Sequence, residues 1–351
     1  MSGEKTPCCC AALSSPVPHP CTAAWSRGDW LGAMRARCSD RFRATFRVMP
    51  GLYAHHAPEP SSPVLVTANY ALSFNHVRRA LGATPAWILV LDTKGINVWC
   101  AAGKGSFGTE ELLRRIGLVG LVTQVTHRRL IVPQLGAVGI AAHEVHKESG
   151  FSVIYGPVRS RDLPAFLRNG NHATPAMRRV RFTVLDRGVL VPIEIRPALQ
   201  RMLPWLALLA GLAGLSREGV LFARMLPVIL PLLAAAAMAV LAGTILHPLL
   251  LPLIPVRAFS LQGALLGALG AVGLIAADIL QPLRSSIDSA AIVATIALSS
   301  YHAFLFTGCT TFTNPTGVKR ELRLAWPFYR AAIGVCALLL AIGLFLHWRR
   351  V

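Results

Sequence analysis

The chain has 351 residues, of which 54% are hydrophobic and only 15% are charged, so it is more apolar than a soluble globular protein normally is. Its formal net charge of +19 would suit nucleic acid, but no run of basic residues is interleaved with aromatic ones, as nucleic-acid binding would favour. Many arginines instead fall between Arg178 and Arg201, just before the first long apolar run. We therefore expect membrane lipid as a partner and no nucleic acid.

The first 45 residues are rich in Pro, Ser, Ala and Arg, show no sustained hydrophobic period and contain no apolar core of a secretory signal. We interpret residues 1–45 as a flexible leader, followed by a cytoplasmic domain over residues 46–195. The leader holds three adjacent cysteines, Cys8, Cys9 and Cys10, which could bind a soft metal, although a disordered leader is the simpler interpretation.

Short apolar strands alternate with helices through the domain that follows. The segment SPVLVTANYALSF predicts a buried strand, Val64 to Thr67, and a helix that runs to Leu81, and AWILVLDTKG predicts a second strand that stops at Asp92. A helix is expected from Thr109, whose hydroxyl can cap the backbone, then a strand in RRLIVPQLG, a helix that ends at Gly150 and a strand in FSVIYGP. This order predicts a Rossmann-like α/β domain with a parallel sheet, in which ligands bind beyond the carboxyl ends of the strands.

The second half of the chain, residues 196–351, contains five apolar runs of about membrane length. We therefore expect an all-α transmembrane domain of five helices in the inner (cytoplasmic) membrane, with the first domain on the cytoplasmic side. The basic residues of the loops agree with this orientation only weakly. The five spans are expected at about 198–215, 225–246, 258–280, 289–308 and 329–347.

Several common motifs do not fit their contexts. The glycines of GKGSFG (103–108) come too far after the preceding strand for a dinucleotide fingerprint, and the sequence around Lys104 is not a P-loop. HEVH (143–146) has the wrong spacing for a zinc-protease helix. A hydrolase that uses Cys100 with His127 or His143 is chemically possible, but nothing in the sequence orients a base.

The segment NVWCAAGK, residues 97–104, places a single cysteine inside the expected domain. Asn97 can cap a short helix of about two turns that ends at Gly103 or Gly105, and Cys100 and Lys104 then share one face. A lysine and a short helix near the thiol would favour its thiolate form, and the small residues beside it would let a large flat ligand approach the backbone. A buried core cysteine is an equally good interpretation of this local pattern.

The segment NVWCAAGK resembles the signature of the HgcA family, the membrane-bound corrinoid proteins of microbial mercury methylation, without a substitution. The stretches PGLYA, VLVTANY, WILVLDTKGI, PQLGA, GFSVIYGPV and FTNPTGVKRE resemble that family too, so the resemblance covers about residues 48–330. It implies a corrinoid-binding domain followed by five membrane spans. The leader, residues 1–45, does not match the family pattern.

The resemblance also implies a chemistry. Cys100 would be the lower axial ligand of the cobalt of cobalamin or a related corrinoid, and the protein would be a methyltransferase that passes a methyl group from the methyl-Co(III) corrinoid to Hg(II). A ferredoxin-like iron-sulfur protein, HgcB, would supply electrons, and the methyl group would come from a methyltetrahydrofolate-linked pathway in an anaerobic cell. The residues implied around the corrin are Thr67, Asn97, Val98, Trp99, Ala101, Ala102, Gly103 and Lys104.

Two alternatives stay open at this point. One is a corrinoid methyl carrier of one-carbon metabolism with an acceptor other than Hg(II). The other is a membrane thiol protein that binds or moves soft metals without a corrinoid.

Overall fold

The structure, a computed structural model, describes residues 17–216, 219–282 and 285–349. The chain forms two compact units, Met1–Val180 and Arg181–Val351. We expected the division at residue 195, but that residue lies inside a continuous helix, α10 (Val191–Gly214), which belongs entirely to the second unit. Cys8, Cys9 and Cys10 lie outside the described residues.

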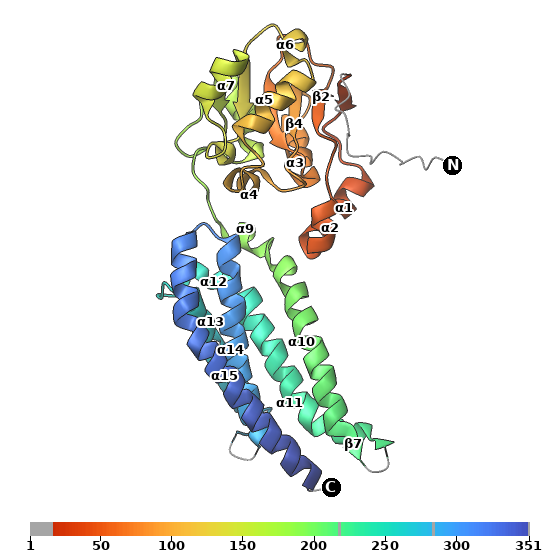
Figure 1. Ribbon diagram of the computed structural model, residues 1–351, viewed down its shortest axis with the longest axis vertical. Helices are drawn as coiled ribbons and strands as arrows, with labels where there is room; N and C mark the ends of the chain where they lie inside the picture. The colour runs from red at the N-terminus through yellow and green to blue at the C-terminus, as the bar shows by residue number, and fades with distance from the viewer. Residues whose placement is uncertain (1–16, 217–218, 283–284, 350–351) are drawn as a thin grey trace, which may run out of the picture. The chain divides into compact units, whose positions relative to one another are not determined.

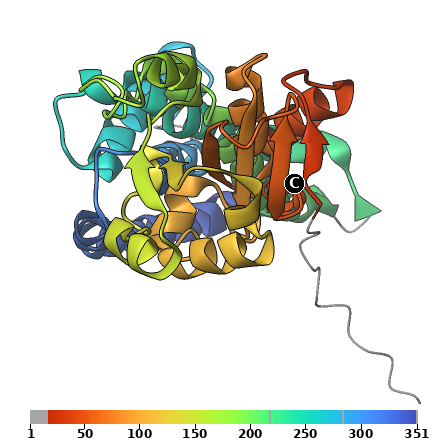
Figure 2. The ribbon, with the colours of Figure 1, turned by 90° about the horizontal axis from the view of Figure 1, so that it is seen from above.

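The described strands of the first unit form a six-stranded sheet in the order β1-β2-β4-β3-β5-β6. The four strands β3 to β6 are parallel, as the sequence predicts, whereas β2 runs antiparallel to β4 and β1 runs parallel to β2. The sheet is therefore mixed, with a parallel part that carries the carboxyl-terminal edge. The strand bounds are β1 His19–Cys21, β2 Gly51–His55, β3 Val64–Ala68, β4 Ala86–Leu91, β5 Arg129–Val132 and β6 Ser152–Tyr155; the red and orange strands lie side by side in Figure 2.

Both faces of the parallel part are apolar, because successive side chains of a strand point to opposite faces. Val64 and Val66 of β3 pack in one core with Phe107 and Leu112, while Leu65 packs in a second core with Phe74 and its neighbours. Helices therefore cover the sheet on two sides. They are α3 Ala71–Leu81, α4 Val98–Gly103, α5 Thr109–Leu118, α6 Leu121–Gln124, the 3-10 turn η1 Gln134–Gly136, α7 Ala142–Ser149, the 3-10 turn η2 Ser160–Asp162 and α8 Leu163–Arg168 (Figure 1).

Residues 17–45, which we expected to belong to a flexible leader, form β1 and two helices, α1 (Arg27–Cys38) and α2 (Asp40–Thr45). Ser26 and Asp29 make a reciprocal capping box at the start of α1. Asp29 also forms an ion pair of 2.7 Å with the buried Arg78 of α3, which fixes α1 on the sheet domain. The hydrophobic period is weak here because the buried face of α1 consists of small residues, Gly32, Ala33 and Ala36, and polar contacts add to it.

The second unit is helical. Within the described residues, four of its helical segments are long and apolar enough to cross a membrane: Phe222–Leu253, Phe259–Ala276, Ser286–Cys309 and Pro315–Arg349. The first expected span, 198–215, corresponds to the second part of α10 and ends one residue beyond it; α10 is not among these four because Gln200, Arg201 and Pro204 lower its hydropathy. The five-helix count therefore stays a prediction.

Short connections join the successive elements of the second unit (Figure 1). A π-helical segment, η3, continues α11, and a short hairpin of β7 and β8 follows α10. The bounds are α9 Val184–Gly188, α10 Val191–Gly214, β7 Leu215–Ser216, β8 Gly219–Val220, α11 Phe222–Val240, η3 Leu241–Leu246, α12 His247–Leu250, η4 Leu251–Leu253, α13 Phe259–Ala276, α14 Ser286–Leu305, η5 Phe306–Cys309 and α15 Pro315–Arg349.

Candidate functional site

The helix that carries Cys100 has the predicted form. Asn97 is the N-cap of α4, and its side-chain Oδ1 accepts a 2.9 Å hydrogen bond from the backbone N–H of Cys100. Ala101 and Ala102 are buried against the sheet, whereas Cys100 is exposed. The alternative of a buried core cysteine is therefore wrong, because the alanines occupy the core-facing positions of this short helix and leave the thiol on the outer one.

A buried asparagine braces the loop between β4 and α4. Asn69, which is 2% exposed, accepts hydrogen bonds at Oδ1 from the N–H of Thr93 (3.1 Å), the hydroxyl of Thr93 (2.9 Å) and the N–H of Gly95 (2.9 Å). Its Nδ2 donates to Oδ1 of Asp92 at 3.0 Å. Gly95 has a φ of +77°, where a side chain would be strained. These hydrogen bonds hold the loop in one conformation and so determine the position of Asn97 and Cys100 at the start of α4.

Two glycines on the loop after β5 let the backbone approach α4. A Cβ on Gly139 would lie 2.1 Å from the carbonyl oxygen of Phe107 and 3.2 Å from Cα of Ala102. A Cβ on Gly136 would lie 2.4 Å from the ring of Phe107. Thr109, expected as a helix cap, is instead the first residue of α5, and its hydroxyl accepts a 2.8 Å hydrogen bond from the N–H of Ala141 in the same loop. The glycines thus allow the loop and α4 to pack as one layer.

A pocket of about 510 Å³ opens at the carboxyl ends of β3, β5 and β6, where the parallel sheet predicts a ligand site. Four of the implied corrin-contacting residues line it: Thr67, Asn97, Val98 and Trp99. The other implied residues lie on or beside the same short helix but not in the pocket wall: Ala101 and Ala102 are buried beneath it, and Cys100, Gly103 and Lys104 are exposed. The structure therefore brings the implied set together around α4.

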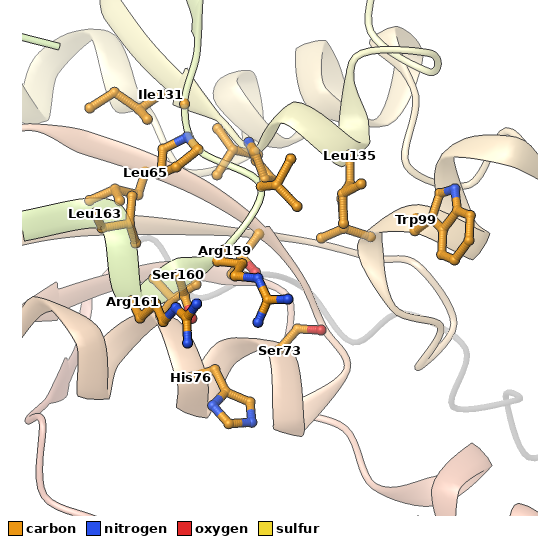
Figure 3. Close-up of a pocket in the computed structure, with 18 of the residues that line it drawn as sticks. Leu65, Ser73, His76, Trp99, Ile131, Leu135, Arg159, Ser160, Arg161 and Leu163 are labelled. Atoms are coloured by element: carbon orange, nitrogen blue, oxygen red, sulfur yellow. The ribbon is translucent and has the colours of Figure 1, made fainter. Parts of the chain in front are cut away.

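One side of the pocket is polar and cationic. In Figure 3, Ser73, His76, Arg159, Ser160 and Arg161 gather on this side, away from Leu135 and Trp99. Burial lowers the pKa of His76, and the positive charges of Arg37 and Arg79 lower it further, so the imidazole is neutral near pH 7. The sequence did not identify these residues, although Arg159 and Arg161 come shortly after the expected strand in FSVIYGP, beyond whose carboxyl end a ligand was expected.

The Cys100 helix and the pocket beside it fit a cofactor that takes one sulfur ligand and contacts an apolar wall. Among the residues that the structure describes, no three His, Cys, Asp or Glu side chains gather into a metal site. The exposed thiol of Cys100 lies on a short helix beside a pocket whose walls are largely apolar. Cys100 would supply a sulfur ligand to a corrinoid cobalt, and the apolar wall would contact the macrocycle.

Part of the first unit is similar in sequence to known proteins. Residues 40–167 match the family model of the CO dehydrogenase/acetyl-CoA synthase delta subunit, CdhD. The gamma subunit of the acetyl-CoA decarbonylase/synthase complex of Archaeoglobus fulgidus is 33% identical over 127 residues, which is 36% of this chain and 27% of the relative. The large subunit of the corrinoid/iron-sulfur protein of Moorella thermoacetica is 32% identical over 114 residues, which is 32% of this chain and 25% of the relative.

The chain thus spans about a quarter of the length of these relatives. The matched residues include β2 to β6, α4 and every residue that lines the pocket, and they do not extend into the second unit. These matches support a corrinoid-protein family for the first unit of this chain.

Proposed function

We propose that this protein binds a corrinoid in its first unit, with the sulfur of Cys100 as a cobalt ligand, and acts as a methyltransferase. The observation that carries the proposal is the exposed thiol of Cys100 on a capped helix beside the pocket at the carboxyl edge of the sheet. The similarity of residues 40–167 to corrinoid-protein subunits supports the choice of cofactor.

The chain's own residues prepare this ligand. The side chain of Asn97 accepts a hydrogen bond from the N–H of Cys100, so the backbone of Cys100 is held at the start of α4. Val98 and Trp99 offer apolar surface on the pocket side, and exposed Lys104 places a positive charge on the same helix face as the thiol. When bound, the corrinoid supplies a methyl group on cobalt, and an anionic sulfur ligand favours its departure with the bonding electron pair.

We further propose Hg(II) as the acceptor. Hg(II) is a soft electrophile that accepts a methyl group with its electron pair, which is the form that a thiolate ligand favours. The match of NVWCAAGK to the HgcA signature motivates this choice. A second candidate is a methyl carrier of one-carbon metabolism with another acceptor, which the relatives favour because their names place them in acetyl-CoA synthesis.

The surroundings of the reaction are part of the proposal. The four long apolar helices would anchor the second unit in the cytoplasmic membrane, with the first unit in the cytoplasm. A ferredoxin-like iron-sulfur protein, HgcB, would return electrons to the cofactor, and a methyltetrahydrofolate-linked donor would renew the methyl group.

A methyl-transfer assay with matched cysteine variants tests the proposal. Full-length protein loaded with methylcobalamin is incubated with Hg(II) or with an alternative acceptor, and methylmercury is measured. Cys38, which is also an exposed free cysteine, provides the control. We expect C38A to retain methylmercury formation and C100A to lose it. Undiminished formation by C100A would contradict the role of Cys100, and transfer only to the other acceptor would favour the methyl carrier.

A further inference from the structure

The helical unit contains two deeply buried histidines that the proposed methyl transfer does not use. His247 is 0% exposed and begins α12, and His302 is 4% exposed near the end of α14. Both lie in segments that are apolar enough to span a membrane. Ionisable side chains at such positions are costly and usually serve a function.

The two histidines come from helices in close contact. A Cβ on Gly243, one helical turn before His247, would lie 2.8 Å from Cβ of His302 and 2.6 Å from the carbonyl oxygen of Ser299. The ring of His247 in turn meets the ring of Phe306, four residues after His302, edge-on at 6.1 Å between centroids. The segments around His247 and His302 therefore pack against each other over more than one turn.

Hydrogen bonding fixes the proton on His247. The side-chain amide N–H of Gln262 donates to the carbonyl of Val256, so Oε1 of Gln262 is its acceptor end. This Oε1 lies 2.8 Å from Nε2 of His247, and Nε2 must therefore carry the proton. The other nitrogen, Nδ1, has a lone pair and is buried, and among the residues that the structure describes it has no hydrogen-bond partner.

A second unpartnered nitrogen lies on the neighbouring helix. Nε2 of His302 is also buried, and no residue in the described part of the chain is its hydrogen-bond partner. Buried polar atoms are nearly always satisfied, so two such imidazole nitrogens on contacting helices require an explanation. His247 directly follows η3, a π-helical segment of the kind that is frequent at functional sites.

We propose that Nδ1 of His247 and Nε2 of His302 bind one soft divalent metal ion, Hg(II), inside the helical unit. Two donors suffice, because Hg(II) prefers linear two-coordination. The hydrogen bond from His247 to Gln262 is the outer contact that metal-binding histidines characteristically make. Imidazoles hold Hg(II) less tightly than thiolates do, so the ion can leave again. The site would thus hold the acceptor of the proposed reaction on its way through the membrane unit. The identity of the ion rests on the proposed function, whereas the two-nitrogen site does not.

The test uses the full-length protein in detergent with its thiols blocked by N-ethylmaleimide. Cys309 and Cys336, the half-buried cysteines of this unit, are replaced by Ala. X-ray absorption at the mercury edge distinguishes nitrogen from sulfur ligands, and competition titration gives the affinity for Hg(II). If the replaced cysteines destabilise the unit, the unreplaced, thiol-blocked protein gives the same ligand assignment.

Two variants remove the nitrogens with little change in shape. H247Q keeps a donor for Gln262 but loses Nδ1, and H302N loses Nε2. We expect each to weaken Hg(II) binding at least about ten-fold, and Q262L to weaken it about 10- to 100-fold. H347Q is the control, since His347 bonds instead to the carbonyl of Ala213 at 3.2 Å.

Nitrogen-coordinated mercury that is lost in H247Q and H302N but kept in H347Q would support the site. Mercury bound only by sulfur, or binding unchanged in both variants, would overturn it. Because binding is measured without methyl transfer, a failure of the methylmercury assay alone would count against the proposed function and not against this site.

Discussion

Asn69 is the residue on which the position of the Cys100 helix depends most. In N69A, the backbone N–H groups of Thr93 and Gly95 lose their acceptor while the loop around them stays buried. Each unsatisfied buried group costs about 1–3 kcal/mol, so the loop should open about 2–6 kcal/mol more easily. The hydroxyl of Thr93 adds nothing to this sum because it can donate to the carbonyl of Ile96 instead, at 2.7 Å.

Hydrogen exchange of the full-length protein measures this opening directly. Since 1.4 kcal/mol corresponds to a factor of ten, peptides covering residues 92–104 should exchange at least roughly 25-fold faster in N69A. N169A is the control, because Asn169 is exposed and bonds only locally, to the carbonyl of His172. Exchange over residues 92–104 that is the same in N69A and in the wild type would refute the claim that Asn69 braces the loop.

Three further predictions follow from the first unit. G139A should displace α4 and lower corrinoid loading, because its Cβ would lie 2.1 Å from the oxygen of Phe107, whereas G117A, with open space around it, should load normally. Iodoacetamide at neutral pH should label the exposed Cys100 but not Cys21, because burial raises the pKa of the Cys21 thiol to about 11. Loading with corrinoid should then protect Cys100 from iodoacetamide, and equal labelling of Cys100 with and without corrinoid would contradict the ligand assignment. Burial opposes ionisation of Asp29, but hydrogen bonds from Ser26 and the Arg78 guanidinium outweigh it and lower the pKa of Asp29. Hydrogen exchange of α1 should therefore be slower in the wild type than in D29N, with the full difference above about pH 3.9 and none once the pH has fallen below the lowered pKa of folded Asp29. A difference that does not change with pH would contradict this.

The parallel strands were predictable because each is a short apolar run that is followed directly by Asn69, Asp92, Pro133 or Gly156. Val64 to Thr67, for example, is confirmed as β3, and the helix capped by Asn97 is confirmed as α4. The carboxyl edge of the sheet followed from this order, and the pocket lies there. Local pattern was sufficient for β3 and β4 because every residue of these two strands is buried.

The antiparallel strand β2 and the segment 17–45 could not be found in the same way. β2 owes its place to five register pairs with β4, and α1 to the ion pair between Asp29 and Arg78. Such contacts join residues far apart in the sequence and leave no local period. The place of Arg159 and Arg161 in the pocket and the hydrogen bond between His247 and Gln262 also depend on tertiary contacts, so the local sequence pattern did not predict them.

The sulfur–cobalt bond at Cys100 is the claim on which the account depends, and the visible spectrum of the purified full-length protein tests it most directly. The wild type loaded with cobalamin should show a spectrum typical of sulfur ligation. C100A should bind less corrinoid or show water in place of sulfur, while C38A should match the wild type. A C100A spectrum identical to that of the wild type, or a wild-type protein that takes up no corrinoid, would contradict the account.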